Sequence, residues 1–324
     1  MTEQELTTII LPVYGRPELL SEALKSILWQ ENPFWKLLIA DDGSDKSTQA
    51  LIKQWINSNA NRQIQWVRRI KNIGLFANLN RAMLDIESEW VLLLCSDDLL
   101  NPQALSMLTE RRRRWPEVGL ILSSFDSINH DGSPRPKDSA WHHDRVSTAT
   151  ALVPPQKLLP ALLRLGSLNG NLTGMAFSRT LWERTGPFIE GWRHAGDWEW
   201  LLRAAEQGPV VLNREPIAAV RTHAEQLSNS NRRSGHELIE VAEVVLRLRL
   251  HPLLAHEPRR KQWAAHIMQF QLWNVLKAAL MGQHQDIGRQ LYAIQRSAGL
   301  MQTAIALIRW LPKRCRQHQR SSAL

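Results

Sequence analysis

The stretch Trp90-Val-Leu-Leu-Leu-Cys-Ser-Asp-Asp-Leu-Leu100 decides the fold expected for this chain. Its first five residues are apolar and give way abruptly to polar ones that end in Asp97 and Asp98, a pattern typical of a buried strand that delivers carboxylates to the edge of a parallel sheet. Ligands bind at that edge. Two interpretations of the acidic pair stay open. It holds a divalent metal that carries phosphates, or it caps a helix expected to begin at Asn101-Pro102.

Three strand and helix pairs are predicted before this stretch. The strands are expected at residues 7–13, 35–40 and 64–68. Each is followed by a segment with the apolar period of a helix, and the first of these helices opens at Pro17. Pro12 is expected to stop the ladder pairing of the first strand. The βαβαβαβ order predicts an α/β fold, with a Rossmann-like, mostly parallel sheet flanked by helices.

Right-handed crossovers bring the loops that follow the first, second and fourth strands to one edge of the predicted sheet. These loops carry Tyr14, the pair Asp41-Asp42, and the pair Asp97-Asp98. The sequence contains neither GxGxxG nor GxxxxGK[ST], so the dinucleotide fingerprint and the P-loop do not explain this edge. Binding is therefore expected to depend on carboxylates and a metal.

The segment from residue 133 to 156 has prolines near both ends and no periodicity, and it is predicted to be a mobile loop. His142 and His143 lie inside it, and we expect a partly solvated pair rather than metal ligands. His223, in contrast, ends a predicted strand on a polar loop.

Asp197 is expected where a later helix begins. It is either a helix cap or a general base. The second interpretation rests on Trp192, Trp198 and Trp200, because indole rings desolvate a carboxylate and stack on a sugar face.

The C-terminal region from residue 229 to 324 holds 15 Lys and Arg against 5 Asp and Glu, whereas the rest of the chain holds 25 against 26. Nucleic acid, anionic lipid and polyanionic partners all fit such an excess, and so does a charged face that only maintains solubility. Two amphipathic helices are predicted at residues 265–279 and 300–311, the second ended by Pro312.

Length and composition favour a cytoplasmic protein of about two domains. The 324 residues are 44% hydrophobic, without an apolar run near the roughly 18 residues that span a bilayer. The first six residues carry no basic segment typical of a signal peptide. Cys95 and Cys315 lack the spacing of a disulfide framework or a zinc site.

Four segments together resemble the family 2 glycosyltransferases, which have the GT-A fold. They are Ile10 to Arg16, Asp41 to Ser44, Asn72 to Gly74 with Asn80, and Ser96 to Asp98. Three further features agree: Gly186 to Phe188, Asp197, and Arg221 to His223 with Ser228. The resemblance implies a GT-A domain at residues 1–228, with a nucleotide-binding half at 1–102 and an acceptor half at 103–228. The helical region 229–324 lies outside it.

The resemblance also implies a role for each matching residue. Positions expected to bind the nucleotide-sugar are Pro12, Tyr14, Arg16, Asp41, Asp42, Lys71, Asn72 and Asp97. Asp98, with Asp97, corresponds to the metal-binding DXD element, and His223 to a residue that approaches the metal or diphosphate. Asp197 corresponds to the catalytic base. Two departures stand out: Cys95 replaces the first carboxylate of the metal motif, and Gly196 replaces the glutamate that often precedes the base.

The implied activity is an inverting transfer of a sugar from a nucleotide-sugar donor to an acceptor hydroxyl, assisted by Mg²⁺ or Mn²⁺. A saccharide or a lipid-linked saccharide in cell-surface polysaccharide or lipopolysaccharide synthesis is the expected acceptor. The basic C-terminal region would then hold the enzyme at the inner face of the cytoplasmic membrane.

Three other functions are less consistent with the sequence. A nucleotidyltransferase needs a phosphate loop that Tyr14-Gly15-Arg16-Pro17 does not supply. A non-catalytic nucleotide-sugar-binding or scaffold protein would explain Cys95. Nucleic-acid binding has no recognised module here and is not expected.

Overall fold

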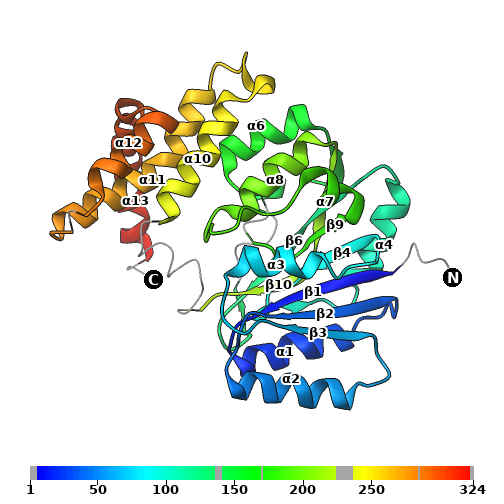
Figure 1. Cartoon of the computed structure of the whole chain (residues 1–324). Coiled ribbons are helices and arrows are strands. Elements are labelled where there is room, and N and C mark those ends of the chain that lie inside the picture. Colours follow the sequence, from blue (N-terminus) through cyan, green and yellow to red (C-terminus); the bar gives the residue numbers. More distant parts are fainter. Residues whose placement is uncertain (1–5, 136–140, 169–170, 224–235, 284, 322–324) are drawn as a thin grey trace. The chain divides into compact units, whose positions relative to one another are not determined.

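The computed structural model describes residues 6–135, 141–168, 171–223, 236–283 and 285–321 (Figure 1). The chain divides into two compact units. The first comprises Met1–Leu158 and Ser167–Gln226, and the second comprises Leu159–Gly166 and Leu227–Leu324.

The first unit is built on a mixed sheet with the strand order β3-β2-β1-β4-β9-β6-β10-β5. Its first four strands in sequence run parallel: β1 Thr7–Val13, β2 Trp35–Asp41, β3 Ile64–Arg68 and β4 Trp90–Leu93. The connecting helices are α1 Pro17–Leu28, α2 Lys46–Ser58 and α3 Leu75–Met83. In Figure 1, α1 and α2 lie on one face of these strands and α3 on the other. The predicted α/β class is confirmed.

The other strands give the sheet its mixed character. β9 Met175–Ser178 runs antiparallel to both β4 and β6 Leu120–Ile128, and β10 Val210–Arg221 runs parallel to β6. Three short strands pair antiparallel at the margin: β5 Leu99–Leu100, β7 Pro134–Arg135 and β8 Ala151–Val153. The remaining helices up to α8 are α4 Ala104–Arg114, α5 Trp141–Asp144, α6 Pro155–Leu165, α7 Arg179–Thr185 and α8 Gly196–Glu206.

Burial on both faces explains why the first half of the sheet forms. All seven residues of β1 are buried, and Ile9, Leu11 and Val13 belong to the same core cluster as Leu20 and Leu24 of α1. Pro12 has a smaller effect than predicted. Pairing with β4 stops at Ile10, but pairing with β2 continues to the end of β1, because Pro12 lacks only the one N–H group.

The chain after Asp98 differs from the expected helix cap. Leu99 and Leu100 form β5, which pairs with Ala218 and Ala219 of β10, and α4 begins only at Ala104. The side chain of Asn101 donates to the carbonyl of Pro216, 2.9 Å away, instead of capping α4. Asp97 and Asp98 therefore do not cap the next helix.

The predicted mobile loop at residues 133–156 is wrong for its described part. The hairpin strand β7, helix α5 and strand β8 lie there, and β8 pairs with β10. His143 is 2% exposed, and its Nδ1 lies 3.3 Å from the Ser124 hydroxyl, so it is a buried residue rather than part of a solvated pair. The pairing of β8 with the distant strand β10 orders this segment. The local periodicity of the sequence does not reveal this pairing, because the partner strand lies far away in the chain.

The second unit is helical. It contains α10 His236–Leu250, the short 3₁₀ helix η2 Pro252–Leu254, α11 Arg260–Leu280, α12 Ile287–Ser297 and α13 Leu300–Ser321. Two helices were predicted where the described residues form four α-helices. The expectation that Pro312 ends the last helix is wrong: α13 continues to Ser321. A proline removes a single backbone hydrogen bond, and the neighbouring bonds carry the helix past it. Within the described residues, no helix is long and apolar enough to span a membrane.

Candidate nucleotide-sugar and metal site

The polar loops predicted to meet at the carboxyl edge of the sheet do so through direct contacts. The turn after β1 is joined to the turn after β2, because the Gly15 N–H donates to the Ser44 hydroxyl at 3.1 Å. Gly15 and Arg16 both have left-handed backbone conformations, with φ of 70° and 58°. Such a conformation is uncommon for a residue with a side chain and is found most often at functional sites. Tyr14, just before this turn, is 61% exposed at the edge.

Asp41 is a fully buried carboxylate at the end of β2. Its Oδ1 accepts a hydrogen bond from the Ser44 N–H at 2.8 Å. Its Oδ2 is buried and has no hydrogen-bond partner among the described residues. A buried acceptor of this kind is costly unless a ligand or water completes it.

Asp42 fastens the loop that precedes α3. Its two oxygens accept hydrogen bonds from the N–H groups of Ile73 and Gly74, at 2.8 and 3.0 Å. Burial raises the pKa of Asp42, and these two backbone hydrogen bonds oppose the rise. Gly43 follows with φ of 78°, and a Cβ there would lie 2.8 Å from the backbone of Lys71. Asp42 therefore holds exposed Lys71 and Asn72 beside the turn after β2.

Asp97 is the point where three separate segments converge. Its Oδ2 accepts a hydrogen bond from Arg16 Nη1 at 2.9 Å and lies 3.0 Å from His223 Nε2. The Asp97 side chain is 16% exposed, and that of His223 is 4% exposed. The structure thus brings together Arg16, Asp97 and His223, which are far apart in the sequence.

Asp98 is buried, unlike its neighbour. Its Oδ1 accepts from the Arg221 N–H at 2.8 Å, and its Oδ2 accepts from the Thr173 hydroxyl at 2.5 Å and the Asn171 amide at 3.2 Å. Burial raises the pKa of Asp98 to about 7, and the nearby Asp97 carboxylate adds to the rise. Both of its oxygens already have protein partners, so Asp98 fixes the turn on which Asp97 stands.

Cys95 occupies the place of the missing first carboxylate. Its Sγ lies 3.4 Å from Asn171 Oδ1. Burial raises the pKa of the Cys95 thiol well above its ordinary value, and the carboxylates of Asp98 and Asp97 reinforce the effect. A protonated thiol is a poor metal ligand, because the thiolate is the form that coordinates.

A metal fits this group of residues on the chemistry of its donor atoms. One ligand atom each from Cys95, Asp97 and Asp98 lies within 4.8 Å of the others. A carboxylate oxygen and an imidazole nitrogen face each other at Asp97 and His223, and these are donor types that divalent cations accept. The pair of Asp97 and His223 presents these donor types at the sheet edge, and the three hydrogen bonds to Asp98 fix the turn beside it.

Arg221 supports this site, and its burial is not predictable from the sequence. Its side chain is 1% exposed. Its Nη2 donates to Glu22 on α1, its Nη1 to the carbonyl of His130, and its Nε to the carbonyl of Asp97. One buried guanidinium therefore ties the end of β10 to α1, to the β6–β7 turn and to the metal-motif turn.

Asp197 lies in the first turn of α8, as predicted, and its Oδ1 accepts a hydrogen bond from the Trp198 N–H at 2.8 Å. Trp192, Trp198 and Trp200 were expected to stack on a sugar, and this expectation is wrong for two of the three. Trp198 and Trp200 are 5% and 0% exposed, and Trp200 packs among Phe177, Trp182 and Phe188 in the core. Trp192 is half-buried.

Gly196 explains how α8 is placed against the nucleotide-binding half. A Cβ on Gly196 would lie 2.4 Å from the ring of Phe76, in the first turn of α3. Asn80 of α3 makes a second link, because its amide pairs with both the N–H and the carbonyl of Phe188 at 2.9 Å. The glycine that departs from the Glu-Asp pattern thus leaves the space that the Phe76 ring occupies.

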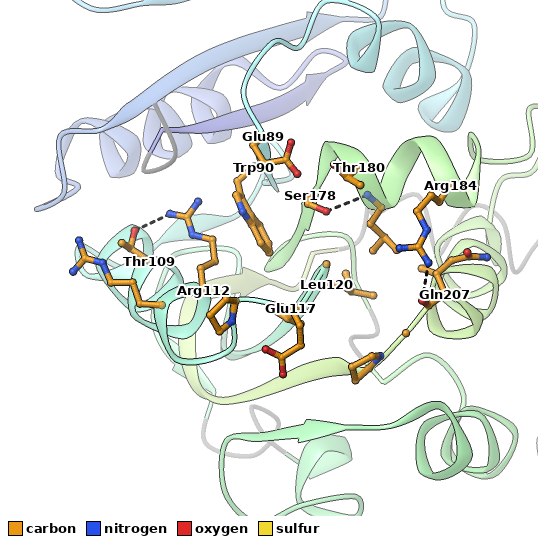
Figure 2. A pocket seen from close by; sticks show the side chains of 18 residues that line it. Glu89, Trp90, Thr109, Arg112, Glu117, Leu120, Ser178, Thr180, Arg184 and Gln207 are labelled. Carbon is orange, nitrogen blue, oxygen red and sulfur yellow. Dashed lines mark hydrogen bonds between the residues drawn. The ribbon is translucent and has the colours of Figure 1, made fainter. Parts of the chain in front are cut away.

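Figure 2 shows a cavity of about 680 Å³ that is separate from the candidate site. It opens at the amino ends of β4 and β6, the opposite edge of the sheet, with Trp90, Leu120 and Arg184 in its lining. None of the residues predicted for nucleotide, metal or catalysis lines it. The candidate site therefore rests on its side chains and not on this cavity.

A mixed α/β sheet with convergent carboxylates at its edge is the architecture of nucleotide-sugar-dependent transferases of the GT-A class. Residues 8–182 match Glycosyl transferase family 2, and the chain belongs to this family. The family predicted from the sequence is confirmed.

Two curated relatives are similar over part of their length. Protein CgeD of Bacillus subtilis is 27% identical over 126 residues, which cover 37% of this chain and 29% of CgeD. The putative colanic acid biosynthesis glycosyl transferase WcaA of Escherichia coli is 26% identical over 114 residues, which cover 35% of this chain and 40% of WcaA. The chain thus spans less than half the length of these relatives.

Two solved structures share the fold. S. aureus TarS 1-349 in complex with UDP-GlcNAc has a TM-score of 0.67 and 16% identity, covering 90% of this chain and 81% of that one. The mannosyltransferase PcManGT of Pyrobaculum calidifontis, in complex with GDP-Man and Mn²⁺, has a TM-score of 0.55 and 16% identity, covering 93% and 86%. The predicted GT-A fold is confirmed by these likenesses.

Proposed function

We propose that this protein is an inverting glycosyltransferase that moves a sugar from a nucleotide-sugar donor to an acceptor hydroxyl. The observation that carries the proposal is the convergence of Arg16 and His223 on Asp97, at the carboxyl edge of the sheet, where open α/β sheets bind their ligands. Relatives named for colanic acid and teichuronic acid biosynthesis support a role in cell-surface polysaccharide synthesis. The acceptor would be a saccharide or a lipid-linked saccharide, reached from the cytoplasm, where nucleotide-sugars are made.

Asp97 and His223 are the proposed ligands of a divalent metal, Mg²⁺ or Mn²⁺. Asp98, first expected to bind the metal with Asp97, is assigned here to holding the turn, because its oxygens accept three protein hydrogen bonds. When bound, the metal would stabilise the charge on the departing diphosphate. Arg16, which donates to the same oxygen of Asp97, is suited to the same anionic group.

The nucleotide itself is assigned to the turns after β1, β2 and β3. Asp41 would accept a hydrogen bond from the base through its unsatisfied Oδ2. Tyr14, exposed beside Pro12, offers a ring and a hydroxyl to the base and ribose. Lys71 and Asn72 would approach the phosphates or ribose from the loop that Asp42 holds in place.

Asp197 is the proposed general base. It would take the proton of the acceptor hydroxyl as that oxygen attacks the anomeric carbon from the face opposite the leaving diphosphate, which inverts the configuration. Its place in the first turn of α8 is favourable for a carboxylate, because a helix N-terminus stabilises negative charge.

A non-catalytic nucleotide-sugar-binding protein is the second candidate, and the protonated thiol of Cys95 in a metal motif favours it. It shares the donor site with the transferase but predicts no turnover. Nucleotide binding and turnover must therefore be measured separately.

The test is the melting temperature of the purified protein with UDP, GDP, dTDP or CMP, each with and without Mn²⁺. A ligand at about a hundred times its dissociation constant stabilises by about 2.7 kcal/mol, a rise of several degrees. We expect one nucleotide to act, and only with the metal. Asp97→Asn should abolish the rise, whereas Asp85→Asn, an exposed carboxylate away from the site, should keep it. If no nucleotide raises the melting temperature, both candidates fail; if one does but release of sugar is absent with every acceptor, the binding protein is favoured.

A further inference from the structure

The second unit exposes an unusual amount of apolar side chain. Among the described residues, ten of the sixteen large hydrophobic side chains that are exposed lie between Leu250 and Ile308. The first unit is about twice as long and holds the other six. Monomeric soluble proteins scatter such residues singly, and a concentration of them marks an interaction surface.

Helix α13 carries an exposed apolar stripe. Met301, Ile305 and Ile308 are 68%, 43% and 67% exposed and follow the i, i+4, i+7 spacing of one helix face. The opposite face is buried, with Thr303 at 0% and Leu307 at 4%. The helix therefore has a core side that packs against α11 and an apolar side that faces solvent.

Helix α12 exposes a face of a second kind. Arg289, Tyr292 and Arg296 are all exposed and share one side of the helix at spacings of three and four residues. Ile294 and Ser297 occupy the buried side. A tyrosine between two arginines suits the boundary between lipid headgroups and acyl chains, where an amphipathic ring is stable and cations meet phosphate.

The charge of this segment has one sign. From Ile287 to the C-terminus the sequence has seven basic residues and no Asp or Glu. A face that only maintains solubility normally mixes both signs. A second copy of the chain is an unfavourable partner, since pairing these faces would bring like charges together.

We propose that α12 and α13 lie on a membrane surface that contains anionic lipids. The α13 stripe would enter the boundary of the acyl chains, and Arg289, Arg296 and Arg309 would contact lipid phosphates. Apolar area and electrostatic attraction act together in such binding. The proposal does not depend on glycosyl transfer.

The test is flotation of the full-length protein with vesicles of phosphatidylcholine alone or of phosphatidylcholine mixed with phosphatidylglycerol. We expect binding to the mixed vesicles only, weakened by salt.

The variant M301Q/I305Q/I308Q should bind at least tenfold more weakly. The variant R289Q/R296Q/R309Q should lose about fivefold per arginine, since each basic residue near such a surface is worth about that factor. Leu84→Gln, which removes a 78% exposed leucine of the first unit, should bind like the wild type.

Two results would overturn the proposal. The first is equal flotation of the wild type and the apolar triple variant, with melting temperatures showing that both are folded. The second is a lipid-free dimer, seen by light scattering, that the triple variant converts to a monomer, because the stripe would then cover a second copy. Flotation measures no sugar transfer, so failure here leaves the proposed activity standing.

Discussion

Arg221 Nη2 lies 2.5 Å from Glu22 Oε2, which joins the last residue of β10 to the middle of α1. The same guanidinium reaches the carbonyls of His130 and Asp97, at 2.6 and 3.0 Å. The positively charged guanidinium of Arg221 is thus buried next to the turn that carries Asp97 and Asp98. The guanidinium therefore holds the backbone of this turn, while the Arg221 N–H donates to the Asp98 carboxylate at 2.8 Å.

Replacement of Arg221 by Met should unfold the protein more easily and weaken metal-dependent nucleotide binding. The substitution removes the hydrogen-bond donor of the Asp97 and His130 carbonyls and the buried partner of Glu22, at an expected cost of about 2–4 kcal/mol. Urea unfolding gives the stability, and the nucleotide-induced rise in melting temperature reports on the site. Glu22→Gln is the control and should cost less than about 1 kcal/mol, because Glu22 is half-exposed. Equal stability of Arg221→Met and the wild type would show that the guanidinium does not hold the turn.

Asp197→Asn should remove sugar transfer and keep donor binding. An amide cannot accept the acceptor's proton, and a general base contributes about 10²- to 10⁴-fold in rate. Initial rates with the identified nucleotide-sugar and the melting temperature with its nucleotide separate the two effects. Asp126→Asn, at an exposed position of β6, should retain the wild-type rate. Normal turnover by a folded Asp197→Asn protein would remove Asp197 from the mechanism.

The first half of the fold could be predicted from the sequence because its signals are local. β1 and β3 have the predicted bounds, and β2 extends one residue further, to Asp41. β1 and β2 are rich in apolar residues, β3 is a shorter and partly polar strand, and each is followed by a helix with one apolar face. The position of Asp97 at the sheet edge follows from this order alone.

The different roles of Asp97 and Asp98 could not be predicted from the sequence, because they depend on residues that are distant in the chain. Asp97 and Asp98 are neighbours in one turn, yet only Asp98 is buried by Arg221, which lies 123 residues later. The core position of Trp200 is hidden for the same reason, since Trp182 and Phe188 reach it from another helix and loop. The spacing of residues in the sequence indicates the candidate site residues. Which of them are exposed to solvent depends on tertiary packing.

Glu199→Gln should destabilise the fold around the candidate base. Glu199 is fully buried, and both its oxygens accept hydrogen bonds from Arg203 at 2.8 Å. Arg203 also donates to the carbonyls of Thr185 and Pro187, so this ion pair fixes the loop beside α8. Removing the charge leaves a guanidinium without its carboxylate, and we expect a loss of about 2–4 kcal/mol in urea unfolding. The matched control is Glu183→Gln, which breaks an exposed ion pair at the same i, i+4 spacing and should cost under about 0.5 kcal/mol. Equal losses in the two variants would mean that burial adds nothing to the pair.

Gly196→Ala should be destabilising because of its contact with Phe76, and a smaller residue at position 76 should reduce the loss that the alanine causes. The added Cβ would lie 2.4 Å from the ring. Inserting an extra carbon into a well-packed core typically costs about 1–3 kcal/mol. Phe76→Leu opens a cavity and lowers stability by itself. If the two side chains compete for one space, the double variant should lose less than the sum of the single losses, by about 0.5 kcal/mol or more.

Gly208→Ala is the control, since a Cβ there meets nothing within 4 Å. Urea unfolding of the four variants measures the coupling. Strict additivity of Gly196→Ala and Phe76→Leu would show that the glycine next to the candidate base is not required by this contact, and that its departure from the family pattern has another cause.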